Sequence, residues 1–124
     1  MTTTTASGKQ LAEEYISAWR RKDPEAMSKL LDPEVHLKSP VTETIGREKF
    51  LETVRKIVPM LRNVRVRASL ASESQAMFVY DFELDSPIGT IPTANLMTFE
   101  NDRIRNVEMF FDARPFENPI AKGS

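Results

Sequence analysis

The feature that most constrains the fold is a change in hydrophobic period after Leu61. Before this point, apolar residues recur every three or four positions, which is typical of helices with one buried face. After it they alternate with polar residues, as in Val64-Arg65-Val66-Arg67, which is typical of strands with one buried face. Helices followed by an unbroken series of strands predict an α+β fold, with the helices packed on one face of an antiparallel sheet.

Three helices and one short strand are predicted before Leu61. The first helix carries an apolar stripe that ends at Trp19, and Asp23 is a good N-cap for the second. Prolines and Gly46 separate the segments, because proline cannot continue a helix and glycine tolerates turn conformations. The predicted segments are a helix from Lys9 to Lys22, a helix from Pro24 to Leu31, a strand from Val35 to Ser39 and a helix from Gly46 to Pro59.

Four strands are predicted after Leu61, near residues 63–71, 76–85, 90–100 and 103–112. Asn101-Asp102 is expected to form a two-residue hairpin loop, since both residue types tolerate positive φ. Pro92 marks the first part of its strand as an edge or a bulge, because proline cannot donate to a neighbouring strand. Long antiparallel strands twist and curl, so the helices and sheet are expected to form a cone with a pocket at its mouth.

The length of 124 residues fits one domain. Its predicted extent is residues 9–116, with a disordered tail at 1–8 and a second tail at 117–124. The first tail has no hydrophobic signal core, and no apolar run approaches the length of a membrane span. We therefore expect a cytoplasmic protein that makes no contact with membranes.

Charge and residue usage exclude several classes of function. Lys and Arg number 17 against 18 acids, whereas a nucleic-acid binder needs surplus cationic charge. Arg62, Arg65 and Arg67 are better explained by cross-strand pairing with acidic residues such as Asp81. The absence of cysteine excludes disulfides, and a single His36 argues against a zinc site. No metal or other cofactor is expected.

The segment LAEEYISAWRRKDPEAM, from Leu11 to Met27, resembles the first helices of nuclear transport factor 2-like proteins. Gly46-Arg47-Glu48 resembles the start of the third helix of that superfamily, and VEMFFDARPF, from Val107 to Phe116, resembles its last strand. The superfamily includes ketosteroid isomerases, SnoaL-like polyketide cyclases, limonene-epoxide hydrolases and scytalone dehydratases. The resemblance covers about Lys9 to Phe116 and implies a cystatin-like α+β fold, but not one chemistry, because this scaffold hosts many activities.

The ketosteroid isomerases offer the most informative comparison within this superfamily. There an Asp base moves a proton while a Tyr and a protonated Asp hold the substrate oxygen. By motif, the resemblance places the Tyr at Tyr15, the second oxygen-binding residue at Asn95, and the base at Ser39, before Pro40-Val41. The pair of hydrogen-bond donors is thus kept, with Asn95 in place of the protonated Asp. Ser39, however, is not a base that can remove a proton from carbon near pH 7.

Further residues are candidates for the pocket. Asp112, in the pair Phe111-Asp112, is similar to an aromatic-Asp pair that ends the last strand of the epoxide hydrolases, so it is a possible proton carrier. The alternation of side chains along a strand instead favours a surface position for Asp112, on the face opposite Val107, Met109 and Phe111. His36 is expected to face solvent or another subunit, and it is the other possible proton carrier. The predicted substrate-binding residues are Trp19, Ser39, Phe78, Tyr80, Phe82, Met97, Phe99, Met109 and Phe111.

Three functions stay open on the sequence alone. The first is an isomerase, cyclase, dehydratase or hydrolase acting on a small hydrophobic molecule with a carbonyl or hydroxyl group. The second is a non-catalytic protein that binds such a molecule in the same pocket. The third is an interaction module. The resemblance also implies a homodimer packed through the outer sheet face, where Val79, Phe110 and Met77 are expected.

Overall fold

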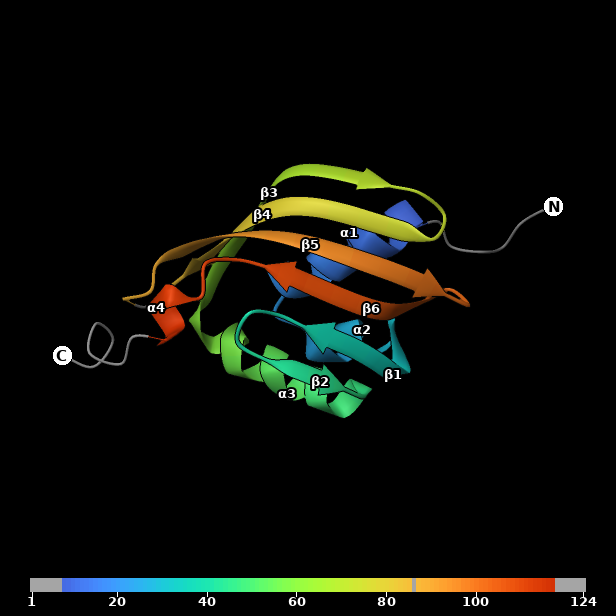
Figure 1. The fold of residues 1–124 in the computed structure, drawn as a ribbon, viewed down its shortest axis with the longest axis horizontal. Helices are drawn as coiled ribbons and strands as arrows, with labels where there is room; N and C mark the ends of the chain where they lie inside the picture. Colours follow the sequence, from blue (N-terminus) through green and yellow to red (C-terminus); the bar gives the residue numbers. More distant parts are fainter. Residues whose placement is uncertain (1–7, 86, 118–124) are drawn as a thin grey trace.

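The computed structural model describes residues 8–85 and 87–117. Figure 1 shows α1, α2 and α3 on one side of a curved sheet, with α4 at one end of that sheet. The helices are α1 (Gly8–Arg20), α2 (Pro24–Ser28), α3 (Arg47–Ile57) and α4 (Arg114–Glu117), with a 3₁₀ turn η1 (Val58–Met60) after α3. The strands are β1 (Leu31–Lys38), β2 (Glu43–Ile45), β3 (Leu61–Ala71), β4 (Gln75–Leu84), β5 (Thr90–Glu100) and β6 (Arg103–Phe110).

The strands form one six-stranded sheet in the order β2-β1-β6-β5-β4-β3. The strands β3 to β6 form the predicted antiparallel series, and no helix interrupts it. The sheet is mixed, however, because β1 lies parallel to β6, with Leu37 opposite Val107. The predicted antiparallel sheet is therefore correct for β3 to β6 but incomplete, because the parallel pairing of β1 with β6 was not predicted. The parallel pair joins strands that are distant in sequence, and no local pattern encodes such a pairing.

The segment around β1 also differs from the prediction. The strand begins at Leu31, within the predicted second helix, and runs through Pro33. The short strand β2 pairs with it antiparallel, His36 lying opposite Ile45, and this strand was not predicted. A three-residue strand carries too few positions to show an alternating pattern.

A β-bulge in β3 reverses the faces of that strand. Val66 lies opposite Tyr80, but the next aligned pair is Ala68 and Val79, so one extra residue stands in β3. An extra residue moves every later side chain to the other face. Leu70 therefore lies on the outer face beside Met77 and is 77% exposed, although simple alternation predicts that it is buried with Val64.

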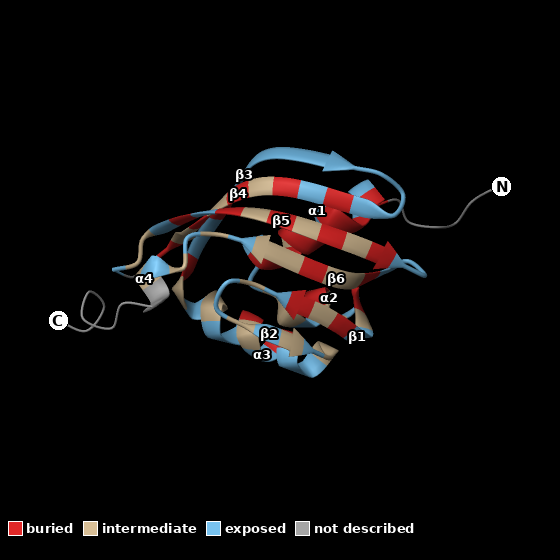
Figure 2. Cartoon of the chain, viewed as in Figure 1, coloured by how far each residue is buried: buried red, intermediate tan, exposed pale blue. Residues whose placement is uncertain are grey.

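The core lies between α1, α3 and the inner face of the sheet. On α1 the predicted stripe is buried, and Trp19 is only 3% exposed. Buried positions alternate with intermediate or exposed ones along β4 and β5, whereas β3 is exposed along most of its length (Figure 2). Arg20 Nε donates a hydrogen bond of 2.9 Å to the Val64 carbonyl, which links α1 to β3.

Two local predictions about β5 are confirmed. Asn101 and Asp102 have φ values of 52° and 62°, as a two-residue loop between antiparallel strands requires. Pro92 pairs with Asp81 of β4, while the pairing of β5 with β6 starts only at Ala94. The missing N–H of Pro92 thus falls where β5 has a single neighbouring strand.

The predicted tails, 1–8 and 117–124, lie almost wholly outside the described residues. Within the described ranges, Gly8 begins α1 and Glu117 ends α4. Across these same ranges, none of the helices combines the length and the apolar character that spanning a membrane requires.

Candidate functional site

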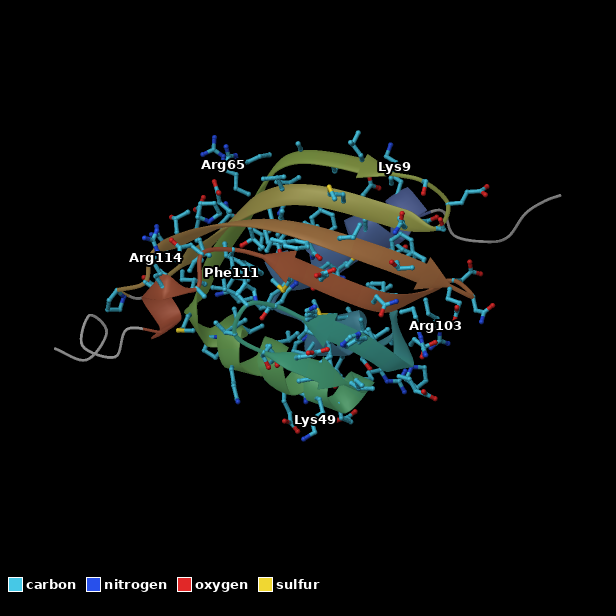
Figure 3. All side chains as sticks on the ribbon, viewed as in Figure 1. Lys9, Lys49, Arg65, Arg103, Phe111 and Arg114 are labelled. Atoms are coloured by element: carbon cyan, nitrogen blue, oxygen red, sulfur yellow. The ribbon has the colours of Figure 1, made fainter. Side chains whose placement is uncertain are left out.

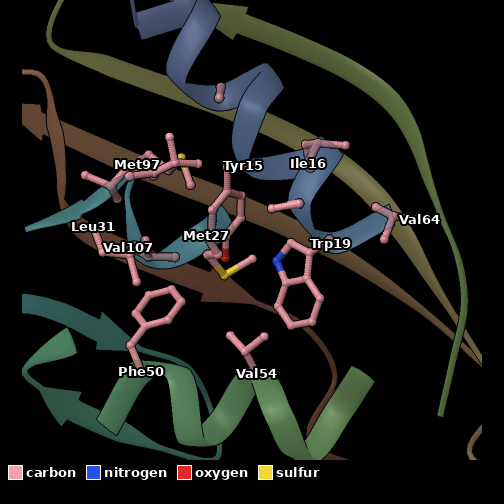
Figure 4. Packing of buried hydrophobic residues seen from close by; sticks show 14 of the residues in the cluster. Tyr15, Ile16, Trp19, Met27, Leu31, Phe50, Val54, Val64, Met97 and Val107 are labelled. Carbon is pink, nitrogen blue, oxygen red and sulfur yellow. The ribbon is translucent and has the colours of Figure 1, made fainter. Parts of the chain in front are cut away.

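Tyr15 lies in the middle of α1 and points into the core. It is 1% exposed, and its ring packs edge-on against the rings of Trp19 and Phe50, with both centroid distances 6.4 Å. Figure 4 shows the Tyr15 hydroxyl and the Trp19 indole nitrogen pointing toward the same region of the core, beside Met27. The helical spacing of four residues places both polar atoms on one face of α1.

The sheet contributes Tyr80 from β4 and Asn95 from β5. Both side chains lie on the inner face, and both residues are 0% exposed. In the antiparallel register Tyr80 is opposite Thr93 and Phe78 is opposite Asn95, so Tyr80 and Asn95 are diagonal neighbours. We call Tyr15, Trp19, Tyr80 and Asn95 the buried polar cluster.

Several atoms of this cluster are buried without a hydrogen-bond partner. They are Trp19 Nε1, Tyr80 Oη, and both Asn95 Nδ2 and Asn95 Oδ1. Buried polar side chains are nearly always partnered, because an unpartnered one costs about 1–3 kcal/mol of stability. The polar groups of the cluster lie close to one another, since hydrogen bonding by Asn95 affects the ionisation of both Tyr15 and Tyr80. Trp19, Tyr80 and Asn95 nevertheless lack a partner with full hydrogen-bond geometry.

Ionisation of the two tyrosines shows how closely the cluster is assembled. Burial raises the pKa of Tyr15 to about 12, while the neighbouring Trp19 and Asn95 side chains act in the opposite direction. Burial also raises the pKa of Tyr80 well above 10; the Tyr15 phenol adds to this effect and Asn95 opposes it. Asn95 thus acts on both phenols, and both are protonated at neutral pH. The cluster therefore contains hydrogen-bond donors and no charged group.

A small apolar cavity adjoins the cluster. Its volume is about 70 Å³, and its lining includes Phe82, Thr93, Met109 and Phe111. Phe82 connects the two regions, since its ring centroid lies 5.0 Å from that of Trp19 and 4.9 Å from that of Tyr80. Figure 3 shows Phe111 at the end of the sheet that carries Arg114, away from Lys9 at the start of α1.

A larger hollow of about 230 Å³ lies between α1 and β3. Charged side chains of α1, namely Lys9, Glu13 and Arg20, contribute to its lining. Like the small cavity, it is lined by none of the four cluster residues, although Phe78, which packs on both cluster tyrosines, contributes to its lining. We take the small cavity as the candidate site because its lining is almost entirely hydrophobic, whereas charged side chains line this hollow.

Three of the candidates from the sequence, Phe82, Met109 and Phe111, line the small cavity. Phe78 packs against Tyr15 and Tyr80, with centroid distances of 6.4 Å and 5.4 Å. Met97 is fully buried on the inner face of β5. Phe99 lies apart from the cavity, beside Gly8 at the start of α1.

Ser39 and Asp112 have local partners instead. The Ser39 hydroxyl accepts hydrogen bonds from the backbone N–H groups of Val41 and Thr42, at 3.3 Å and 3.2 Å, and so stabilises the turn before β2. Asp112 is exposed, and its carboxylate lies 2.6 Å from Arg114 Nη2. The hydrogen bonds from Arg114 lower the pKa of Asp112 to about 2, which makes this carboxylate a weak base at neutral pH.

His36 pairs with Glu43 across the β1–β2 ladder, with Nε2 and Oε2 2.7 Å apart. The His36 side chain is 36% exposed, as expected for a residue that alternates with buried Val35 and Leu37. No cluster of three or more metal-ligating side chains occurs within residues 8–85 and 87–117.

The sequence analysis missed part of the cavity lining. Ile57 ends α3 and Met60 ends the 3₁₀ turn after it, and Leu84, Ile91 and Thr93 lie on β4 and β5. The sequence could have identified Ile91 and Thr93, because residues two and four positions from Asn95 face the same side of a strand. Ile57 belongs to the apolar stripe of the predicted third helix, whereas no pattern marks Met60. Which cavity the two residues line depends on how α3 packs against the sheet.

Comparisons with known proteins agree with this architecture. An NTF2-like protein of unknown function from Cytophaga hutchinsonii superposes with a TM-score of 0.80 at 21% identity, covering 95% of this chain and 100% of its own. A candidate ketosteroid isomerase from Kribbella flavida superposes with a TM-score of 0.73 at 19% identity, covering 82% of this chain and 75% of its own. A candidate polyketide cyclase from Sinorhizobium meliloti superposes with a TM-score of 0.72 at 15% identity, covering 80% of this chain and 92% of its own.

These identities are low, so the three structures show a shared fold and not a shared activity. A comparison with curated protein sequences found no match. The sequence itself matches the SnoaL-like domain family over residues 12–107, which is most of the chain and includes Tyr15, Trp19, Tyr80 and Asn95. The chain therefore belongs to the SnoaL-like domain family of the NTF2-like superfamily.

Proposed function

We propose that this protein binds a small, neutral and largely apolar molecule inside the curved sheet and holds an oxygen atom of that molecule with Tyr15 and Asn95. The observation that carries this proposal is the group of buried, unpartnered atoms on Trp19, Tyr80 and Asn95. A ligand oxygen in their midst would supply the missing hydrogen bonds and recover the stability that they cost.

The surroundings of the cluster favour an apolar body on that ligand. The adjoining cavity is lined almost entirely by hydrophobic side chains, and Phe82 and Thr93 connect it to the cluster. Its volume of about 70 Å³ is less than the ~150 Å³ that holds benzene in an engineered protein cavity. Met60 and Met109 in its lining are flexible side chains that adapt to a larger occupant.

Binding without proton abstraction fits the chemistry of the described residues best. The cluster and the cavity lining contain no carboxylate and no imidazole within residues 8–85 and 87–117. Ser39 is engaged in its turn, and Asp112 is paired with Arg114. Donors without a base can hold an oxygen atom, but they cannot remove a proton from carbon.

A second candidate function is catalysis on the same ligand, as an isomerase, cyclase, dehydratase or hydrolase. The observation that favours it is the meeting of Tyr15 and Asn95, since two donors directed at one oxygen stabilise an enolate. Exchange of ketone α-protons with deuterated water separates the two functions. Binding without accelerated exchange supports a binding protein, whereas exchange that depends on Tyr15 supports an enzyme.

Trp19 provides a direct test of binding, because it is the only tryptophan in the chain. Its indole N–H gives one resonance in a ¹H–¹⁵N spectrum, and this resonance reports the environment of the cluster. Titration with cyclopentanone is expected to shift it saturably, and cyclopentane, which has no oxygen, serves as the control ligand. Asn95→Leu is expected to abolish the saturable shift. An indole resonance that does not respond to a series of small ketones contradicts the proposal.

A further inference from the structure

The unpartnered atoms of the cluster differ in whether they donate or accept hydrogen bonds. Trp19 Nε1 can only donate, Asn95 Nδ2 has two protons to donate, and Tyr80 Oη donates or accepts. Asn95 Oδ1 is the single position among them that can only accept. These positions offer up to four donors and the Tyr15 hydroxyl adds a fifth, while Asn95 Oδ1 takes a proton from one of the two phenols or from a ligand.

A lone carbonyl oxygen does not match this set. It accepts about two hydrogen bonds and donates none, so at least one of the donors would stay unpartnered even where a tyrosine hydroxyl serves Asn95 Oδ1. A single hydroxyl group supplies the proton but still accepts only about two bonds. Two oxygen atoms on neighbouring carbons, one of which carries a proton, can serve all of the open positions.

The same positions favour a head group without charge. The cluster contains no cationic side chain, and the burial of both phenols keeps them protonated. A carboxylate held there would be a buried charge without a counter-ion, which is costly. The acceptor Oδ1 of Asn95 would also face the carboxylate oxygens without receiving a proton.

We infer that the ligand presents a neutral pair of adjacent oxygens, such as a hydroxy ketone, to the buried polar cluster, and that Tyr80 and Trp19 make the protein specific for the second oxygen. This inference rests on the proposed function and refines it. Tyr15 and Asn95 hold one oxygen. Tyr80, the diagonal neighbour of Asn95, and Trp19, one helical turn from Tyr15 on α1, serve the other.

Paired ligands test the inference on the full chain. The affinities of 2-hydroxycyclopentanone and cyclopentanone are measured by titrating the Trp19 indole resonance, with cyclopentanecarboxylate at pH 7 as the charged comparison. We expect the hydroxy ketone to bind about tenfold more tightly than the ketone, the value of one well-placed buried hydrogen bond. The carboxylate is expected to show no saturable binding.

Tyr80→Phe removes one oxygen and keeps the ring that packs on Phe78 and Phe82. In this variant the tenfold preference is expected to fall to about one. Thr93→Val is the matched control: it also removes one buried hydroxyl, opposite Tyr80 in the ladder, but that hydroxyl already donates to the Ile91 carbonyl at 3.1 Å. The preference should survive this change.

The outcomes separate this inference from the proposed function. If cyclopentanone binds and the hydroxy ketone binds no better, the proposed function stands and the two-oxygen inference is overturned. A preference that Tyr80→Phe leaves intact overturns the role of Tyr80, and saturable binding of the carboxylate overturns the neutral head group. If none of the ketones binds, the proposed function itself fails.

Discussion

The Tyr15 hydroxyl of α1 and the Asn95 amide of β5 meet in the core, close enough for the amide to influence the ionisation of the phenol. The two residues belong to opposite layers of the fold, and only the packing of α1 against the sheet brings them together. Neither amide atom of Asn95 makes a hydrogen bond of full geometry there, although the amide lies close enough to both phenols to affect their ionisation. The pair therefore combines a buried donor with a buried group that is available to a ligand.

Replacement of Asn95 by leucine is expected to stabilise the ligand-free protein. The change removes two unpartnered polar atoms from the core at similar volume, so the free energy of unfolding should rise by about 1–2 kcal/mol. Urea denaturation measures this difference. Thr93→Val is the matched control, and because the Thr93 hydroxyl is already partnered, no gain is expected. If Asn95→Leu is instead clearly destabilising, the amide has a structural partner in solution.

Alkaline pH should unfold the protein through its tyrosines. The pKa of Tyr15 is raised from 10.0 to about 12, so the folded state favours the protonated phenol. The stability from this shift is fully present below pH 10 and is lost as the pH rises through about 12, a change of about 3 kcal/mol. Tyrosinate absorbance and circular dichroism should change together above pH 10. Ionisation of either tyrosine near pH 10 in the folded state would contradict their burial.

Substitution of Gly8 by alanine should destabilise the start of α1. A Cβ atom there would overlap the Ser72 carbonyl oxygen and stand 2.9 Å from the Phe99 ring. The carbonyl belongs to the backbone and cannot move aside easily, so we expect a loss of about 1–3 kcal/mol in urea denaturation. Lys9→Ala, at the exposed next position, should change stability by less than about 0.5 kcal/mol. Equal stabilities for the two variants would show that this close approach is absent.

The outer face of the sheet is expected to form a homodimer interface. Met77 and Phe110 are 46% and 49% exposed there, and the register groups them with other apolar residues, Ala68, Leu70, Val79, Ala94 and Leu96. An exposed apolar patch of this kind favours a partner surface.

Light scattering at micromolar concentration is therefore expected to give twice the chain mass, and Phe110→Glu is expected to give the monomer mass. Lys49→Glu places the same new residue on exposed α3, on the helical side of the sheet, and should leave the dimer intact (Figure 3). A monomeric parent chain would count against the interface.

Much of the local structure was encoded in the sequence. The change of period after Leu61 predicts four strands whose bounds differ from the observed ones by at most two residues. The helical spacing places Tyr15 and Trp19 on the buried face of α1, and Asn101-Asp102 predicts its hairpin loop. These features depend on residues near in sequence, through helix and strand geometry and the φ angles that each residue type tolerates. For that reason a single chain reveals them.

Only the tertiary structure determined the contacts between residues that are distant in sequence. The bulge in β3 turned Leu70 outward, the parallel pairing of β1 with β6 made the sheet mixed, and a turn engaged the Ser39 hydroxyl. Above all, the fold left the amide of Asn95 without a partner beside Tyr15. Whether a buried polar atom has a partner depends on every element packed around it, so no periodicity along the chain can specify it.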